Sequence, residues 1–240
     1  MSEPRGPGAL LGWAWRLYLA NWRPALAIAA TAGVVEWLLT VATAHPGPGP
    51  FATVAVPSPL GAIVSAIFAI WSSATLLNFF GGPADGPRTD GGAVMACARL
   101  GLLRLWPFFV TSVVVGLVGG VGFLLLIIPG VWLITRWGVA IVVAATGRGP
   151  AVAALSRSFA LTAGHFWHAL GTLLLGTLLP SLLAAAATAA GTAILTVIGL
   201  RGSAGIGLWG ALMAAAASPW SMATLVALYD DLVLRSGAAD

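Results

Sequence analysis

Six long runs of apolar residues constrain this chain more than any motif does. They cover residues 24–44, 60–80, 106–128, 130–146, 166–191 and 206–229. Hydrophobic residues make up 59% of the sequence and charged residues only 8%, which is too little charge to cover the surface of a soluble domain. Because about 20 apolar residues cross a bilayer as a helix, the runs predict six transmembrane helices in a single membrane domain, residues 1–240.

The apolar runs are expected to be helices and not barrel strands. Lipid offers no hydrogen-bond partner to the backbone, and the runs lack the alternating polarity of barrel strands, so the sequence predicts an all-α polytopic fold. Only Pro129 separates the third run from the fourth, which begins at Gly130, and this predicts a tight hairpin there. The end of the fifth helix is open, because residues 192–199 can continue it.

Every positively charged side chain is an arginine, and these arginines predict the orientation of the chain. Nine of the eleven fall on one side of the predicted spans: Arg5, Arg16, Arg23, Arg88, Arg99, Arg104, Arg148, Arg157 and Arg235. The positive-inside rule therefore places both termini in the cytoplasm, with no need for a cleaved signal peptide. The net charge of +4 is interpreted as contact with anionic lipid headgroups, and nucleic acid is not an expected partner.

Three shorter segments have the spacing of amphipathic helices that lie in the headgroup plane: residues 10–22, 92–104 and 151–165. Each precedes a pair of predicted spans. Two interpretations remain open: three parallel repeats of an interfacial helix and a transmembrane hairpin, or the ordinary enrichment of tryptophan and arginine at a cytoplasmic interface. The residues predicted to bind anionic headgroups on this side are Arg16, Arg23, Arg99, Arg104 and Arg157.

Glu36 and Arg136 are the only ionisable residues deep within the predicted spans. If both helices are straight, the two side chains lie within about 3 Å of the same depth, which predicts an intramembrane charge pair. We keep three interpretations of it: a structural lock, an arginine that reaches outward while Glu36 is protonated, and a substrate or proton site.

Asp230 and Asp231 end the last predicted helix, where an acidic pair is unfavourable for the helix dipole. A clamp between this helix and basic residues of an interfacial helix is therefore expected in preference to phosphate or metal binding. Arg104 and Arg157 are the basic residues expected there.

The remaining residues exclude several kinds of chemistry. The single Cys97 and two interfacial histidines without nearby carboxylates or thiols predict no metal site and no cofactor. No nucleophile, base and acid occur at a workable spacing, so we expect no enzyme. The glycines at 116, 119, 120 and 122 form a small-residue face in the third span, and Gly116 and Gly120 make one GxxxG motif, which predicts close helix packing.

The last part of the chain resembles a known family. Residues 129–133 read Pro-Gly-Val-Trp-Leu, residues 155–167 read Leu-Ser-Arg-Ser-Phe-Ala-Leu-Thr-Ala-Gly-His-Phe-Trp, and residues 228–235 read Leu-Tyr-Asp-Asp-Leu-Val-Leu-Arg. These segments resemble bacterial membrane proteins related to the membrane domain of glycerophosphoryl diester phosphodiesterases. The catalytic activity of that family belongs to a separate soluble domain, which we do not expect here. The resemblance therefore implies a bacterial inner-membrane fold and a membrane role, and no reaction.

Two classes of function follow. One is a non-enzymatic module that binds anionic lipid or supports a membrane-protein partner in the cell envelope, favoured by the interfacial helices and their arginines. The other is a transporter or lipid-moving permease, favoured by the charge pair and by helix-breaking Pro180 and Pro219. A connected polar cavity lined by Glu36 and Arg136 would indicate transport, whereas a closed bundle with an exposed groove would indicate a lipid-binding or scaffold role.

Overall fold

The computed structural model describes residues 5–43, 45–46, 55–56, 58–82, 91–199 and 203–237. Nearly all of these residues are helical. The only strands among them are β1 (His45–Pro46) and β2 (Ala55–Val56), which form one short antiparallel pair. The predicted all-α class is confirmed.

Six helical segments are long and apolar enough to cross a membrane, as the sequence predicts. They are Trp22–Thr43, Pro59–Gly81, Leu105–Leu125, Ile127–Thr146, Phe166–Val197 and Gly205–Ser236. The fifth continues to Val197, beyond the predicted residue 191. The chain is a multi-pass membrane protein.

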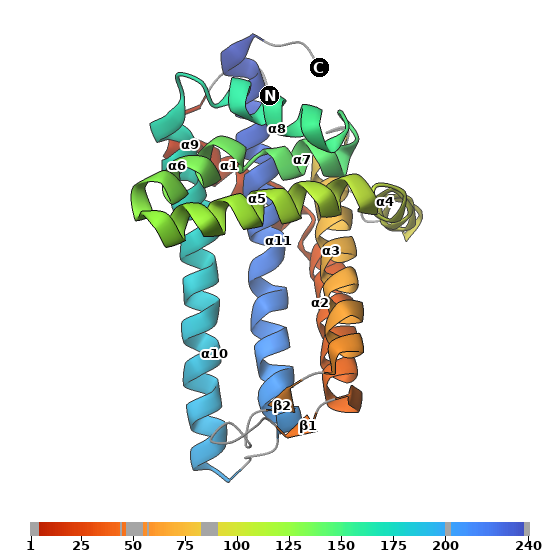
Figure 1. Cartoon of the computed structure of the whole chain (residues 1–240). Helices are drawn as coiled ribbons and strands as arrows, with labels where there is room; N and C mark the ends of the chain where they lie inside the picture. The colour runs from red at the N-terminus through yellow and green to blue at the C-terminus, as the bar shows by residue number, and fades with distance from the viewer. Residues whose placement is uncertain are drawn as a thin grey trace.

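Four long helices run side by side through the lower part of the molecule (Figure 1). They are α2 (Trp22–Thr43), α3 (Pro59–Gly81), α10 (Leu179–Val197) and α11 (Ser203–Ser236). α2 packs against both α3 and α11, and α10 packs against α11, so α11 is the central helix. Small residues permit this contact: a Cβ atom on Gly33 of α2 would lie 3.2 Å from the carbonyl oxygen of Ala211 on α11.

α10 continues a shorter helix without a break. α9 (Phe166–Leu173) leads through a π-helical turn, η2 (Leu174–Leu178), into α10. The turn comes directly before Pro180, whose ring cannot fit a regular α-helical ladder, so the extra residue of the π turn accommodates it. Pro219 likewise lies inside the unbroken α11. The two prolines therefore distort their helices without ending them.

The other end of the bundle carries a layer of shorter helices. It contains α1 (Pro7–Ala20), α4 (Gly91–Leu103), α5 (Leu105–Leu125), α6 (Ile127–Trp137), α7 (Ala140–Thr146) and α8 (Ala151–Leu161). Both ends of the chain lie on this side (Figure 1). Within the layer, α5 runs crosswise to the four long helices, and α6 turns back beside it.

We call this layer, together with the adjoining ends of α2 and α11, the arginine layer. It contains the nine arginines of the described residues: Arg5, Arg16, Arg23, Arg99, Arg104, Arg136, Arg148, Arg157 and Arg235. The hydrophobic core lies where this layer meets the bundle, since Leu77 and Phe79 of α3, Val143 of α7 and Tyr229 of α11 are all buried there. By contrast, α10 has no buried residue, as expected of a helix whose solvent is lipid.

The predicted hairpin between the third and fourth runs is present, but its turn is earlier than expected. The turn lies at Leu126, whose backbone is extended, and Pro129 and Gly130 belong to the first turn of α6. Proline is tolerated there because the first N–H groups of a helix have no partner within it. The fourth run is also divided, because Gly138 and Val139 separate α6 from α7.

The glycine face that packs this hairpin is not the predicted GxxxG motif. No described atom of another element lies within 4 Å of a Cβ position on Gly116 or Gly120, so these two glycines of the predicted face do not pack within the chain. A Cβ on Gly122 would instead lie 2.9 Å from the Cα of Gly130, and one on Gly119 would lie 2.8 Å from Ile134. The partner helix, which sequence spacing alone does not specify, decides which glycines are needed.

We expect Gly122→Ala to destabilise the protein, because its methyl group meets the backbone of α6 and forces the two helices apart. Overpacking of this kind costs about 1 to 3 kcal/mol. Gly120→Ala, in the same helix, has open space and should be neutral or slightly stabilising. Thermal unfolding in detergent measures both, and equal melting temperatures for the two variants would contradict the packing described here.

Candidate functional site

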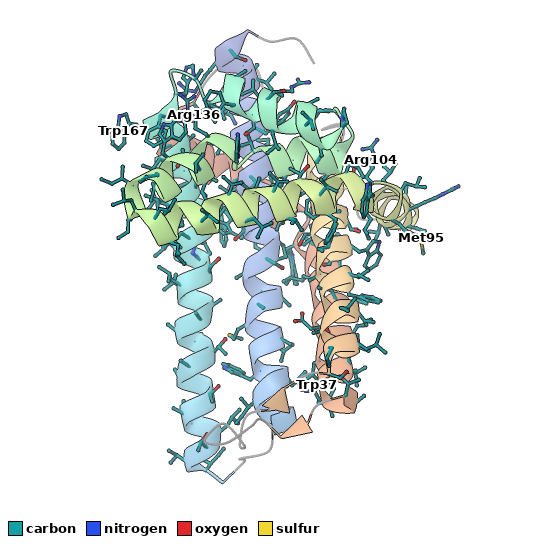
Figure 2. All side chains as sticks on the ribbon, viewed as in Figure 1. Trp37, Met95, Arg104, Arg136 and Trp167 are labelled. Atoms are coloured by element: carbon teal, nitrogen blue, oxygen red, sulfur yellow. The ribbon has the colours of Figure 1, made fainter. Side chains whose placement is uncertain are left out.

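The structure separates the two residues of the predicted charge pair. The Arg136 guanidinium lies 4.5 Å from the ring centroid of Phe159 on α8, and its Nη1 donates to the Phe159 carbonyl oxygen at 3.3 Å. Glu36 instead lines a cavity between α2, α3 and α11. Figure 2 shows Arg136 in the arginine layer and Trp37, the neighbour of Glu36, near the opposite end of the bundle.

The prediction of a Glu36–Arg136 pair is therefore wrong, and the reason is the depth assigned to Arg136. That depth assumed that residues 130–146 cross the membrane as one straight helix. The carbonyl oxygen of Arg136 accepts a hydrogen bond from Ser158 Oγ at 2.8 Å, which fixes this residue beside α8. Arg136 therefore lies with the other arginines of the arginine layer, and Glu36 does not pair with it.

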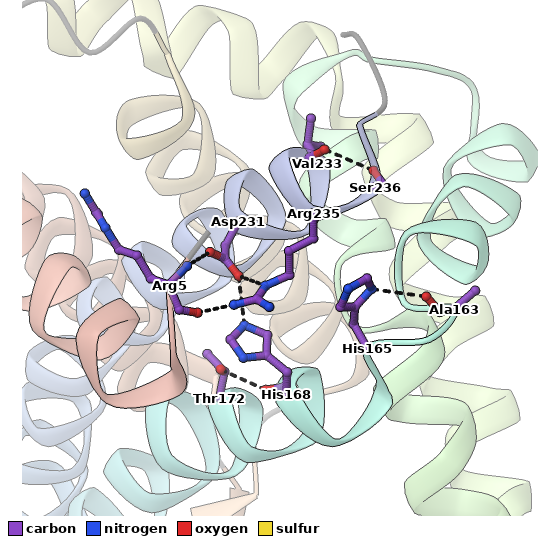
Figure 3. A network of polar contacts seen from close by, with 9 residues as sticks. All are labelled: Arg5, Ala163, His165, His168, Thr172, Asp231, Val233, Arg235 and Ser236. Carbon is purple, nitrogen blue, oxygen red and sulfur yellow. Dashed lines mark hydrogen bonds and ion pairs between the residues drawn. The ribbon is translucent and has the colours of Figure 1, made fainter. Parts of the chain in front are cut away.

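The buried carboxylate of Asp231 contacts several segments at the end of the bundle that carries the arginine layer (Figure 3). Its Oδ2 accepts from Nε of Arg235 at 2.6 Å and lies 2.9 Å from Nε2 of His168 on α9. Its Oδ1 accepts from the backbone N–H of Arg5 at 2.7 Å, and the Arg235 guanidinium also donates to the Arg5 carbonyl oxygen. Asp231 thus joins the last helix to α9 and to the chain ahead of α1.

The basic neighbours of this carboxylate differ from those expected. Arg104 donates to Asn78 Oδ1 at 3.3 Å, and the Arg157 guanidinium lies 5.8 Å from the ring centroid of Tyr229. Asp230, beside Asp231, is half-buried. His168 and Arg235, which were not predicted from the sequence, are the basic side chains that contact Asp231. An acid at a helix C-terminus indicates that basic partners exist, but only the folded chain shows that His168 is one.

The arginines predicted to bind headgroups divide into two groups. Arg16, Arg23 and Arg99 are exposed, and Arg23 lies over the ring of Trp22 at 5.4 Å. Arg104 and Arg157 are half-buried against α3, α7 and α11. Only the first group presents its charge freely to the surroundings of the protein, so headgroup binding stays a prediction that fits Arg16, Arg23 and Arg99 best.

One exposed arginine borders an apolar groove between α3 and α4. The groove has a volume of about 480 Å³, and six of the residues that line it are Ile67, Phe68, Trp71, Met95, Arg99 and Leu102. Arg99 is the only charged residue among the described ones that line it. We call this feature the α3–α4 groove. No sequence motif indicated it, because its walls come from two segments that α4 brings together.

Two contacts hold α4 in place and keep the groove formed. Trp71 Nε1 donates to the Ala98 carbonyl oxygen at 3.1 Å. Gly101 rests directly on Thr75, since a Cβ atom there would lie 3.1 Å from the Thr75 backbone nitrogen. The Met95 side chain is largely exposed at the groove. Figure 2 shows it near Arg104. The groove therefore combines a preformed apolar surface with one cation at its border.

Two smaller cavities lie on α11 within the bundle. One, of about 400 Å³, is between α10 and α11, and the other, of about 140 Å³, contains Glu36. Both are lined by Ala214 and Ser218. Serine and threonine hydroxyl groups and the Glu36 carboxyl group line these cavities and could bind a small polar ligand. Among the described residues, no group of three His, Cys, Asp or Glu side chains could hold a metal ion.

Comparison with known proteins gives no relative: no family model, no curated protein and no solved structure matches this chain. The resemblance to the membrane domain of glycerophosphoryl diester phosphodiesterases stays a prediction.

We expect Asp231→Asn to destabilise the protein by about 3 to 5 kcal/mol, because it leaves the cation of Arg235 without its anion at a buried site. Asp230→Asn makes the same chemical change one residue earlier, at a half-buried position, and should cost less. Thermal unfolding in detergent at pH 7 compares them. A loss at Asp230 equal to or larger than the loss at Asp231 would contradict the central place given to Asp231.

Proposed function

We propose that this protein is a non-enzymatic integral membrane protein that binds anionic lipid in the α3–α4 groove. It would lie in a bacterial cytoplasmic membrane with both termini and the arginine layer on the cytoplasmic side. The positive-inside rule supports this orientation, because all nine described arginines lie at one end of the bundle. The resemblance noted in the sequence supports a membrane role of the same general kind.

The groove carries the proposal. Its apolar walls suit an acyl chain, whose CH₂ groups can pack against them as they pack against neighbouring lipid chains. Arg99 at its border suits the phosphate of a headgroup, because a guanidinium makes strong, directional hydrogen bonds to phosphate oxygens. The combination of one cation and a long apolar surface matches the two parts of a lipid.

The other exposed arginines extend this preference around the protein. Arg16 and Arg23 lie on α1 and at the start of α2, away from the α3–α4 groove. Near an anionic membrane surface each adds about 1 kcal/mol of attraction, whatever the lipid species. Arg16 and Arg23 therefore attract acidic lipid without forming a binding site, whereas Arg99 acts together with the apolar walls of the α3–α4 groove.

Transport is the second candidate function, and the cavities on α11 favour it. An ionisable residue within a membrane span usually faces a functional site, and Glu36 opens into such a cavity beside Ser72 and Ser218. Arg136, the residue expected to complete a polar pathway, is elsewhere. We therefore place lipid binding first, and a partner protein in the envelope remains compatible with it.

We expect Arg99→Gln to lower the retention of anionic lipid about fivefold, since it removes about 1 kcal/mol of attraction at the groove. Arg16→Gln is the matched control: it removes the same charge from an exposed position on α1 that does not line the groove. Native mass spectrometry of the two purified variants, with phosphatidylglycerol and phosphatidylcholine supplied equally, measures the lipid retained.

The expected result is a larger loss of phosphatidylglycerol in Arg99→Gln than in Arg16→Gln, with phosphatidylcholine unchanged in both variants. Equal losses in the two variants would mean that the arginines act as general surface charge and that the groove is not a site. If neither variant loses lipid, the arginines serve only orientation, and the cavities beside Glu36 become the better basis for a function.

A further inference from the structure

The α5–α6 hairpin does not follow the four long helices, although both of its apolar runs are long enough to cross a membrane. We propose that it stays within the leaflet of the arginine layer and presents its exposed apolar face to the acyl chains of that leaflet. Four helical segments, not six, would then cross the membrane.

The position of α6 is the first reason. The ring of Trp132 meets the ring of Phe159 edge to face at 5.8 Å, and one helical turn later Arg136 contacts the same residue. Phe159 belongs to α8, whose ends adjoin Arg148 and the turn before His165. The stretch from Trp132 to Arg136 therefore runs beside α8 in the arginine layer and does not descend into the bundle.

Helix geometry then limits how deep the hairpin can reach. The turn at Leu126 is six residues before Trp132, which is about 9 Å of helix at 1.5 Å per residue. The hydrocarbon core is about 30 Å thick. Even if this segment pointed straight down, its turn could not approach the far face of the membrane.

The side chains at the turn indicate what surrounds it. Five consecutive aliphatic residues, 124–128, form the tip, and Leu124 is 90% exposed while Ile128 is 82% exposed. A loop facing water on the far side would hardly carry such a run, because exposing it costs several kcal/mol. No charged residue occurs anywhere from 105 to 135. The tip therefore suits hydrocarbon.

Part of the backbone at the turn is paired within the protein. Leu126 donates its N–H to the Gly122 carbonyl oxygen at 3.0 Å and accepts at its own carbonyl oxygen from the Gly130 N–H at 3.3 Å. Pro129, in the first turn of α6, has no N–H that could be left without a partner. A turn within lipid has to satisfy its polar groups in this way, since no water is present to do so.

Lipid is a better occupant of this face than a protein partner. The exposed side chains of α5, such as Leu117 and Val121, continue the kind of surface that Leu182 and Leu183 present on α10, a spanning helix that lipid must surround. Because the two faces are equally apolar, we expect the same solvent around both. The protein then occupies more area in the leaflet of the arginine layer than in the opposite leaflet.

A fluorescence experiment tests the placement in vesicles. A bimane probe is attached at Leu126→Cys, and at Ser58→Cys as the control in the loop before α3, both in a Cys97→Ala background. Quenching is then measured with nitroxide-labelled lipid and with aqueous iodide. We expect the probe at position 126 to be quenched by the lipid nitroxide and protected from iodide, and the probe at position 58 to be quenched by iodide.

Two results would overturn the proposal. Iodide quenching at position 126 as strong as at position 58 would place the turn in water, as expected of a spanning hairpin. Protection from both quenchers would mean that protein and not lipid covers the tip. Ile128→Cys, two residues further on and more exposed than Leu126, repeats the measurement should Leu126→Cys fail to fold.

Discussion

The cost of placing an uncompensated charge in hydrocarbon is the constraint on which this structure depends. All arginines in the described part of the chain gather at one end of the bundle, where they meet carboxylate, carbonyl, amide or aromatic groups or remain exposed. Arg136 shows the constraint most clearly, because α6 turns aside to bring it to Phe159 on α8. Because α6 brings Arg136 into this layer, it runs beside α8 and does not descend into the bundle.

The arginine layer and the bundle are held together where they meet. Asp231 joins α11, α9 and the chain ahead of α1, while Asn78 on α3 donates to the Ala145 carbonyl oxygen on α7 at 2.9 Å. The core around Tyr229 and Phe79 fills the same level. Below it, helix contacts depend on small residues such as Gly33, and cavities remain around Ser218. Much of the buried core thus lies at the arginine layer, which is also where the α3–α4 groove lies.

Much of the fold could be predicted from the sequence, because long apolar runs and proline–glycine breaks are local signals. The helices and the common side of the arginines follow from them. The depth of Arg136 could not, since it depends on the interruption at Gly138 and on contact with α8. The same holds for the glycine face: Gly116 and Gly120 fit a motif, but α6 packs on Gly119 and Gly122. His168 and the α3–α4 groove arise only when distant segments meet.

The central claim is that one apolar hairpin lies within a leaflet while four helical segments cross the membrane. A nitroxide scan along α5, one residue at a time from 106 to 125 in lipid vesicles, tests it most directly. The account predicts that the accessibility of the nitroxide to oxygen and to a water-soluble nickel complex rises and falls with the helical period. The mean depth of the nitroxide in the bilayer should stay constant along α5. A depth that rises steadily to a maximum in the middle of α5 and falls again would show that the helix crosses the bilayer and would contradict the account.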